Sequence, residues 1–190
     1  MITAKSSPGF DLPASEWVVS HASKVVPGGR VLDYACGHGR HALWLASQGF
    51  NVVAVDKDVE VLEGLAEKAR IFSLPIVTQA IDLEENIWKF SDSEYVEAFD
   101  GLVATNYLYR PVLLQLPKLL KKQGVLIYET FAVGNEAFGK PSNPNFLLQP
   151  NELLSFSSNM KILAYEDLQI QSPKQACIQR ICAVPLQSKT

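Results

Sequence analysis

Three acidic residues and two glycines occupy positions from which they could bind a nucleotide-like cofactor. Asp33, Gly37 and Gly39 lie close together after a short apolar stretch, and Asp56 and Asp82 each end a later apolar run. Glycine lets a backbone approach a ligand closely and open a helix behind the turn. Taken singly, each acid could instead be a helix cap or a turn residue. Their recurrence at the ends of successive strands favours a cofactor site.

The same glycines also fit a dinucleotide-binding turn. Residues 37–42 satisfy the pattern G-x-G-x-x-A, and Asp56 follows at about the distance expected of a ribose-binding acid. A dinucleotide would place its pyrophosphate over this turn, where a desolvated Asp33 would repel it by about several kcal/mol. S-adenosylmethionine carries a sulfonium and an ammonium and no phosphate, so Asp33 would attract it. The charge favours S-adenosylmethionine, with a nicotinamide-dependent oxidoreductase as the alternative.

The run Val-Leu-Asp-x-x-Cys-Gly-x-Gly-Arg at 31–40 resembles the first motif of class I S-adenosylmethionine-dependent methyltransferases. The resemblance implies that Asp33 holds the methionine ammonium, Asp56 the ribose hydroxyls and Asp82 the adenine amino group. The other cofactor-binding residues that it implies are Ala35, Gly37, Gly39, Lys57, Leu83 and Asn106. Ala35 stands where the family usually has its first glycine, and alanine disfavours a positive φ.

The acceptor side of this expected site does not select one substrate. Tyr107 follows the predicted fourth strand and Glu129 ends the fifth, so both are candidate catalytic or substrate-contacting residues. Glu129 could instead pair with Arg110 or cap a loop, and Tyr107 could pack as an aromatic on a helix face. The Asn-Pro-Pro-Tyr motif of enzymes that methylate base amines or glutamine amides does not follow the fourth strand. A small-molecule acceptor is therefore expected.

A long loop at 132–149 holds several glycines, prolines and asparagines, which is typical of a lid or a binding loop. With the preceding Tyr-Glu-Thr-Phe, it resembles a run in a subgroup of small bacterial methyltransferases. The pattern is also loosely similar to tellurite-resistance and thiol-type methyltransferases. Ala35 and the missing catalytic motif leave a further alternative open, a non-catalytic S-adenosylmethionine-binding partner protein.

The elements that must position these residues alternate between strands and helices. Strands are predicted at 30–34, 51–56, 76–81, 100–105 and 125–131, and helices at 15–26, 40–48, 59–71, 111–122 and from 150, with a short helix and loops at 84–97. Two final β-rich runs, 160–169 and 176–184, lie too close for a crossover and predict a hairpin. The expected fold is one α/β domain over 1–190, a doubly wound, mainly parallel seven-stranded sheet with a C-terminal antiparallel hairpin and helices on both faces.

Composition excludes several classes of protein. The chain is 47% hydrophobic and 19% charged with a net charge of −3, which argues against nucleic-acid binding. Lys118, Lys121 and Lys122 cluster at the end of a predicted helix, where they complement its dipole. No run resembles a signal peptide or reaches the roughly 18 apolar residues of a membrane span. The three cysteines lack metal-ligand spacing, so a cytoplasmic protein without a metal site is expected.

Overall fold

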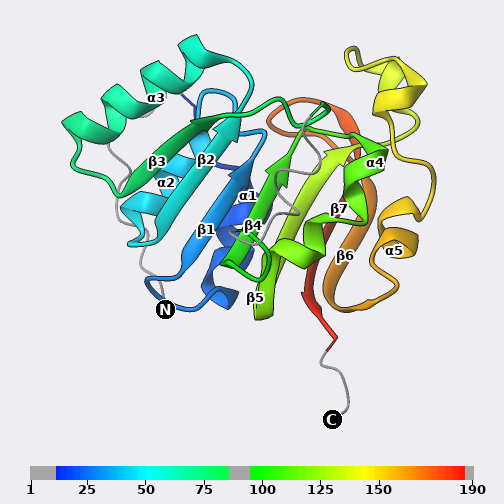
Figure 1. Ribbon diagram of the computed structural model, residues 1–190. Coiled ribbons are helices and arrows are strands. Elements are labelled where there is room, and N and C mark those ends of the chain that lie inside the picture. The colour runs from blue at the N-terminus through cyan, green and yellow to red at the C-terminus, as the bar shows by residue number, and fades with distance from the viewer. Residues whose placement is uncertain (1–11, 86–94, 187–190) are drawn as a thin grey trace.

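A computed structural model describes residues 12–85 and 95–186 of the chain. Its centre is a seven-stranded sheet in the order β3-β2-β1-β4-β5-β7-β6 (Figure 1). The strands are β1 (Arg30–Tyr34), β2 (Asn51–Asp56), β3 (Ile76–Ala80), β4 (Phe99–Thr105), β5 (Leu120–Phe131), β6 (Met160–Ile170) and β7 (Ala176–Pro185). Strands β1 to β5 are parallel, whereas β7 runs antiparallel to both β5 and β6. The predicted mixed sheet with a terminal hairpin at its edge is confirmed.

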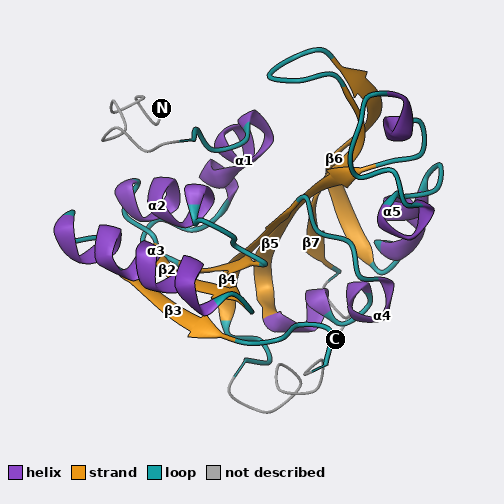
Figure 2. Cartoon of the chain, turned by 90° about the horizontal axis from the view of Figure 1, so that it is seen from above, coloured by secondary structure: helices purple, strands orange, loops and turns teal. Residues whose placement is uncertain are grey.

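Helices cover both faces of the sheet (Figure 2). The helices are α1 (Glu16–His21), α2 (Arg40–Ser47), α3 (Val59–Ile71), α4 (Arg110–Leu113) and α5 (Glu152–Phe156). Alternate residues of a strand point to opposite faces, so Val31 packs with α1, α2 and α3 while Leu32 packs with α4 and α5. Two apolar cores therefore sandwich the sheet and hold its strand ends in register.

The predicted helix at 111–122 is wrong. Only Arg110–Leu113 is α-helical, Leu116–Leu119 is a 3-10 turn, and Leu120 already begins β5, where it pairs with Phe99. Pro117 lacks the N–H that a continuing α-helix needs at this point. The lysine cluster consequently does not end a helix, and Lys121 lies in β5 with its Nζ 2.8 Å from an Asp100 carboxylate oxygen.

Other predicted boundaries differ little from the structure. The helix predicted at 15–26 consists of α1 and a 3-10 turn at Ala22–Lys24. The loop at 132–149 contains two 3-10 turns, Asn135–Ala137 and Pro144–Phe146. The short helix predicted within 84–97 falls largely outside the described residues. In the described ranges, the helices are too short or too polar to cross a bilayer.

Candidate functional site

The loop from Ala35 to Gly39 connects β1 to α2 at the carboxyl edge of the sheet, where ligands bind in doubly wound folds. Its backbone has positive φ at three positions, 56° at Ala35, 51° at Gly37 and 74° at Gly39. A β-carbon at Gly39 would lie 2.4 Å from a methyl carbon of buried Leu65, so only glycine fits there. A β-carbon at Gly37 would meet no atom within 4 Å. Gly37 therefore leaves open space above the loop, into which a ligand can fit.

Ala35 adopts a left-handed backbone conformation, which an alanine side chain disfavours. Left-handed geometry costs an L-amino acid about 1–2 kcal/mol, yet the loop keeps the turn that glycine would adopt more easily. The hydrogen bond from the N–H of neighbouring Cys36 to the Val55 carbonyl, at 2.9 Å, anchors the loop to β2. This contact holds the chain next to Ala35, which keeps its positive φ.

Asp33 lies beneath this loop, on the sheet face that carries α2. Its side chain is only 1% exposed, and its Oδ2 accepts a 2.9 Å hydrogen bond from the Ala42 N–H in α2. Burial raises the pKa of this carboxyl from 3.8 to about 7, although the Ala42 hydrogen bond and the Arg40 charge oppose the shift. The site therefore has a buried acid that titrates near neutrality and whose ionised form a nearby cation would favour.

Asp56 joins the ends of two neighbouring strands. Its Oδ2 accepts a 2.8 Å hydrogen bond from the Gly37 N–H, and its Oδ1 accepts one of 3.1 Å from the Asp58 N–H. The structure therefore brings the predicted glycine turn and the predicted ribose acid into direct contact. The carboxylate holds the turn and lies beside the space above Gly37.

Asp82 and Leu83 follow β3 at the same edge. Hydrogen bonds from the Glu84 and Glu85 N–H groups, aided by the charge of Lys57, hold the pKa of Asp82 below its usual value. The side chain of Leu83 is buried at 4% exposure and belongs to the apolar core that contains Leu32.

A cavity of about 570 Å³ opens over the loop. The predicted residues Ala35, Gly37 and Asn106 line it, together with Arg40 and His41. Asn106 also has a positive φ, 55°, and its N–H donates to the Glu129 carbonyl at 2.9 Å. Asp33, Gly39, Lys57, Asp56, Asp82 and Leu83 do not form its wall. Asp33 and Gly39 lie behind the loop, which they support.

Glu129 pairs with partners other than the one considered from the sequence. Its carboxylate accepts a 2.8 Å hydrogen bond from Ser15 Oγ and lies 3.2 Å from Arg180 Nη1. Arg110 instead pairs with Glu152, at 2.7 Å. The partners of Glu129 come from opposite ends of the chain, and no local pattern marks them as neighbours.

His41 completes this network. Its Nε2 accepts a 3.2 Å hydrogen bond from the Ser15 N–H, and its Nδ1 lies 3.4 Å from Thr105 Oγ1. Burial lowers the pKa of His41 to about 3, so the ring is neutral at physiological pH. His41 thus accepts a hydrogen bond that fixes the start of α1.

Tyr107 lies on the opposite face of the sheet from His41. Its ring packs edge-on against Tyr34 with centroids 5.7 Å apart, and its buried hydroxyl has no hydrogen-bond partner among residues 12–85 and 95–186. It does not line the cavity over the loop. A catalytic role for Tyr107 therefore stays a prediction without a contact that supports it.

A second cavity of about 460 Å³ adjoins the first, and Arg40 and Asn106 line both. Glu129, Phe131 and the residues that precede α1 form its inner wall, and the 132–149 loop and the β6–β7 turn form its rim. The turn curls toward the face that carries α1 (Figure 2). The arrangement gives two connected chambers at the carboxyl edge of the sheet.

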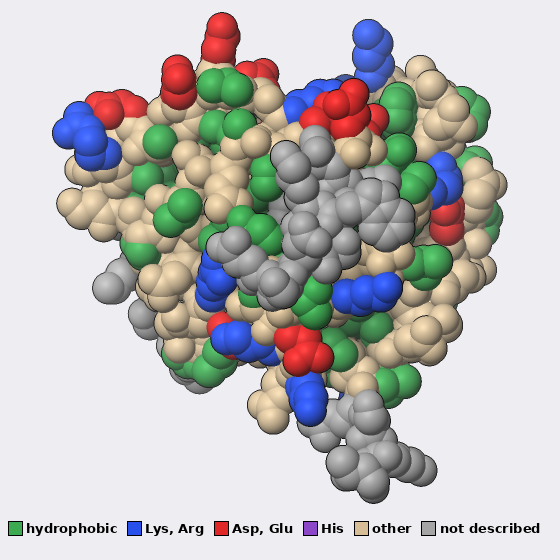
Figure 3. All heavy atoms as spheres, in the orientation of Figure 1, with side chains coloured by type: hydrophobic (Ala, Val, Ile, Leu, Met, Phe, Trp, Pro, Cys, Tyr) green, Lys and Arg blue, Asp and Glu red, His purple; other side chains and the backbone are tan. Residues whose placement is uncertain are grey.

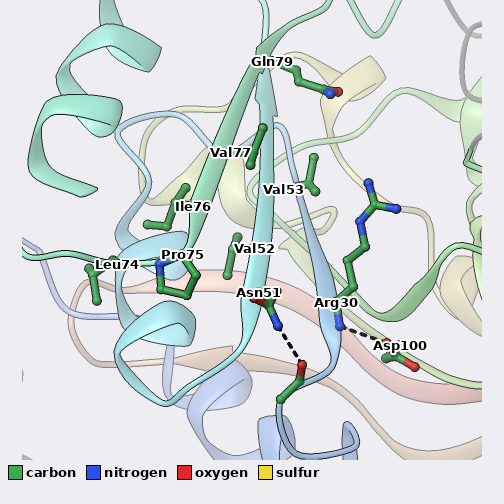
Figure 4. Close-up of a pocket in the computed structure, with 11 residues that line it drawn as sticks. Arg30, Asn51, Val52, Val53, Leu74, Pro75, Ile76, Val77, Gln79 and Asp100 are labelled. Atoms are coloured by element: carbon green, nitrogen blue, oxygen red, sulfur yellow. Dashed lines mark hydrogen bonds between the residues drawn. The ribbon is translucent and has the colours of Figure 1, made fainter. Parts of the chain in front are cut away.

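A third cavity of about 560 Å³ lies at the other end of the strands (Figure 4). The Arg30 N–H donates to Asp100 Oδ2 at 2.9 Å, and Asn51 Nδ2 donates to the Gly28 carbonyl at 2.9 Å. The polar groups that line this cavity thus form hydrogen bonds that connect neighbouring strands near their first residues. The glycine turn and the strand-end acids that predict a cofactor are all at the opposite edge.

Proteins of known family resemble this chain in sequence. A family model described as tellurite resistance protein TehB matches residues 8–169. A putative methyltransferase, YqeM of Bacillus subtilis, is 29% identical over 126 residues, covering 62% of this chain and 48% of that protein. The 23S rRNA (uracil(1939)-C(5))-methyltransferase RlmD of Halomonas elongata is 36% identical over 72 residues, covering 38% of this chain and 15% of RlmD.

Solved structures share the fold. TehB from Haemophilus influenzae superimposes with a TM-score of 0.73 at 20% identity, covering 93% of this chain and 64% of that one. A SAM-dependent methyltransferase from Methanosarcina mazei gives 0.70 at 16% identity, covering 93% and 100%. The chain spans less than half of either curated relative. The methyltransferase-type fold expected from the sequence is confirmed, and the family model covers most of the chain: the chain belongs to the TehB family.

Proposed function

We propose that the protein is a methyltransferase that transfers the methyl group of S-adenosylmethionine to a small molecule. The observation that carries the proposal is a buried carboxylate, Asp33, beneath an open turn at which Gly37 leaves space for a ligand. A buried negative charge favours a cationic cofactor over a pyrophosphate. The TehB family assignment and the SAM-dependent methyltransferases among the fold neighbours support the same cofactor.

In this proposal, the residues at the carboxyl edge hold separate parts of the cofactor. Ala35, Gly37 and Gly39 shape the turn under the methionine portion, and Asp33 attracts its ammonium from below the turn. Asp56 accepts the ribose hydroxyls, with Lys57 beside it. Asp82 and the Leu83 backbone contact the adenine, and Asn106 lies beside the methyl group. The cofactor supplies an electrophilic methyl group, and the protein's residues align the acceptor with it.

Glu129 then acts as a positioning residue. Ser15 and Arg180 already occupy its two carboxylate oxygens, so a proton transfer to Glu129 would break one of these contacts. An acceptor that is nucleophilic at neutral pH needs alignment and exclusion of water more than a general base. Glu129 contributes by fixing the start of α1 against the second cavity.

The small-molecule acceptor and a cytoplasmic location belong to the same proposal. The second cavity, about 460 Å³, has the size of a small-ligand pocket. In the solved structure of a coclaurine N-methyltransferase, the bound molecules are N-methylheliamine and S-adenosylhomocysteine. A small molecule at the second cavity would lie next to Asn106, which both chambers share.

Isothermal titration with S-adenosylhomocysteine tests the cofactor, with NADH as the comparison. We expect one S-adenosylhomocysteine site per chain and no binding of NADH, because Asp33 disfavours a pyrophosphate over the turn. Absence of heat with S-adenosylhomocysteine at high micromolar levels would contradict the proposal, and NADH binding would favour an oxidoreductase. A screen of acceptors that follows S-adenosylhomocysteine release then separates an enzyme from a non-catalytic binding protein.

A further inference from the structure

The second cavity is positively charged in a protein that is negatively charged overall. Four cationic side chains and two acidic ones line it, whereas the whole chain carries a net charge of −3. The cations are Arg40, Lys140, Lys174 and Arg180, and the acids are Glu16 and Glu129. The charge of the wall is thus opposite in sign to that of the molecule. Such a local field attracts anions.

Two of these cations have partners of their own within the protein. Arg180 pairs with Glu129 at 3.2 Å and with Glu166, and its guanidinium lies 4.7 Å from the Trp17 ring centroid. Arg40 lies near the buried carboxyl of Asp33, and its positive charge opposes the rise in the pKa of that carboxyl that burial causes. Both positive charges are therefore at least partly balanced without a ligand.

Lys140 and Lys174 differ from these arginines. Both are exposed at the rim, and neither forms an ion pair or hydrogen bond with residues 12–85 or 95–186. They come from different segments, the 132–149 loop and the β6–β7 turn. A β-carbon at Gly139 would lie 3.5 Å from Lys174 Nζ, so the Lys174 ammonium lies against the residue that precedes Lys140. The fold brings two uncompensated positive charges together at the mouth of the cavity.

The inner wall of the cavity is different in character. Phe131 and Ile178 of the sheet, with Phe138 of the 132–149 loop, contribute apolar surface to the lining. A cavity of about 460 Å³ is far larger than a small inorganic oxyanion, which would leave this apolar surface wet. A ligand that fills it has an apolar body facing the cofactor side and an anionic group at the rim.

We infer that the acceptor is an organic carboxylate with an apolar body, whose carboxylate binds Lys140 and Lys174. The inference rests on the proposed function and specifies its substrate class. It also gives the 132–149 loop a role, because this loop supplies one lysine and Phe138. The carboxylate then fixes the orientation of the acceptor, so that the end remote from the rim faces Asn106 and the methyl group.

The test measures binding rather than turnover, using 3-phenylpropionate and its uncharged isostere 3-phenylpropionamide as probes. Each is titrated into the S-adenosylhomocysteine-loaded protein and followed by ligand-observed NMR. We expect the carboxylate to bind at least about tenfold more tightly than the amide, since the ion pairs form only with the charged probe. Lys140→Gln combined with Lys174→Gln should abolish this difference and leave amide binding unchanged.

The matched control is Lys118→Gln combined with Lys122→Gln, which removes the same charge from exposed positions outside the cavity. It should keep the carboxylate preference. Equal binding of both probes, or the same loss in the control variant, would overturn the inference. Displacement of 3-phenylpropionate by inorganic phosphate at equal concentration would also overturn it, since the apolar body would then contribute nothing. Carboxylate binding without S-adenosylhomocysteine binding would contradict only the proposed function.

Discussion

Asp33 should make both stability and cofactor affinity depend on pH near neutrality. Burial raises the pKa of its carboxyl from 3.8 to about 7 in the folded protein. The folded state therefore binds this proton more tightly than the unfolded state. Stability from this group is fully present below the unfolded pKa and is lost as the pH rises to the folded one. About three pKa units correspond to a loss of about 4 kcal/mol over this range.

The variant Asp33→Asn removes the titration and keeps a side-chain oxygen for the Ala42 N–H. Its unfolding free energy should lack this decline, so the difference between variant and wild type should change by about 4 kcal/mol between pH 4 and pH 8. Urea unfolding at closely spaced pH values measures the difference. The amide introduced at this position could lower the unfolding free energy by the same amount at every pH. Such a constant offset would leave the pH dependence of the difference between variant and wild type intact.

The same carboxyl should couple proton release to cofactor binding. A sulfonium and an ammonium stabilise the ionised form, so the affinity for S-adenosylmethionine should rise about tenfold per pH unit below about pH 7 and then level off. Titration calorimetry in buffers of different ionisation enthalpy would detect release of about one proton at pH 6. Asp33→Asn should bind more weakly and release none.

Asp100→Asn is the matched control with the opposite sign. Lys121 holds the pKa of Asp100 below its usual value despite burial, so its contribution is lost as the pH falls. Removal of the Asp100 carboxylate should leave in place the decline of the unfolding free energy between pH 4 and pH 7, which belongs to Asp33. If Asp33→Asn showed the wild-type pH dependence of stability and the wild-type proton release, the assignment of this titration to Asp33 would be refuted.

Further substitutions test the loop and the network around it. Gly39→Ala should cost about 3 kcal/mol in urea unfolding because its methyl meets Leu65, whereas Gly37→Ala should cost about 1 kcal/mol and mainly weaken S-adenosylhomocysteine binding. Ala35→Gly should stabilise the protein by about 0.5–1 kcal/mol, since it relieves the positive φ; a loss of stability would contradict this. Asp56→Ala should weaken S-adenosylhomocysteine binding at least about tenfold, and calorimetry showing wild-type affinity would place the ribose elsewhere. Ser15→Ala should cost about 1–2 kcal/mol by removing the cap of α1 and a partner of Glu129, while the exposed Ser20→Ala should stay within about 0.5 kcal/mol of wild type.

The placement of the proposed cofactor-binding residues at one edge of the sheet could be predicted from the sequence because its signals are local. Asp33 lies near the end of β1, Asp56 ends β2 and Asp82 comes two residues after β3, and parallel strands bring those ends to one edge. The hydrogen bond from Gly37 to Asp56 spans only 19 residues. The helix at 111–122 was predicted wrongly because its apolar spacing suits a helix, whereas Pro117 and the pairing of Leu120 with Phe99 end it early.

The acceptor side could not be predicted in the same way. The contact between Ser15 and Glu129 joins residues 114 apart, and that between Glu129 and Arg180 joins residues 51 apart. The second depends on the pairing register of β5 with β7, which places Arg180 opposite Glu129, and the first depends on where α1 packs against the sheet. Short-range periodicity does not determine that register. Arg110 was the nearer cation in the sequence, but the fold directs it to Glu152.

The position of β7 between β5 and β6 has a consequence for synthesis on the ribosome. The strand that supplies Arg180 is the last of the sheet to emerge, although its residues 178–183 pair with residues 126–131 of β5. A nascent chain that ends before β7 can form the glycine turn and the contacts of Asp56. It still lacks Arg180 beside Glu129, and Ala176 and Ile178 in the lining of the second cavity. The glycine turn and the contacts of Asp56 can therefore form before β7 is synthesised, whereas the Glu129–Arg180 ion pair cannot.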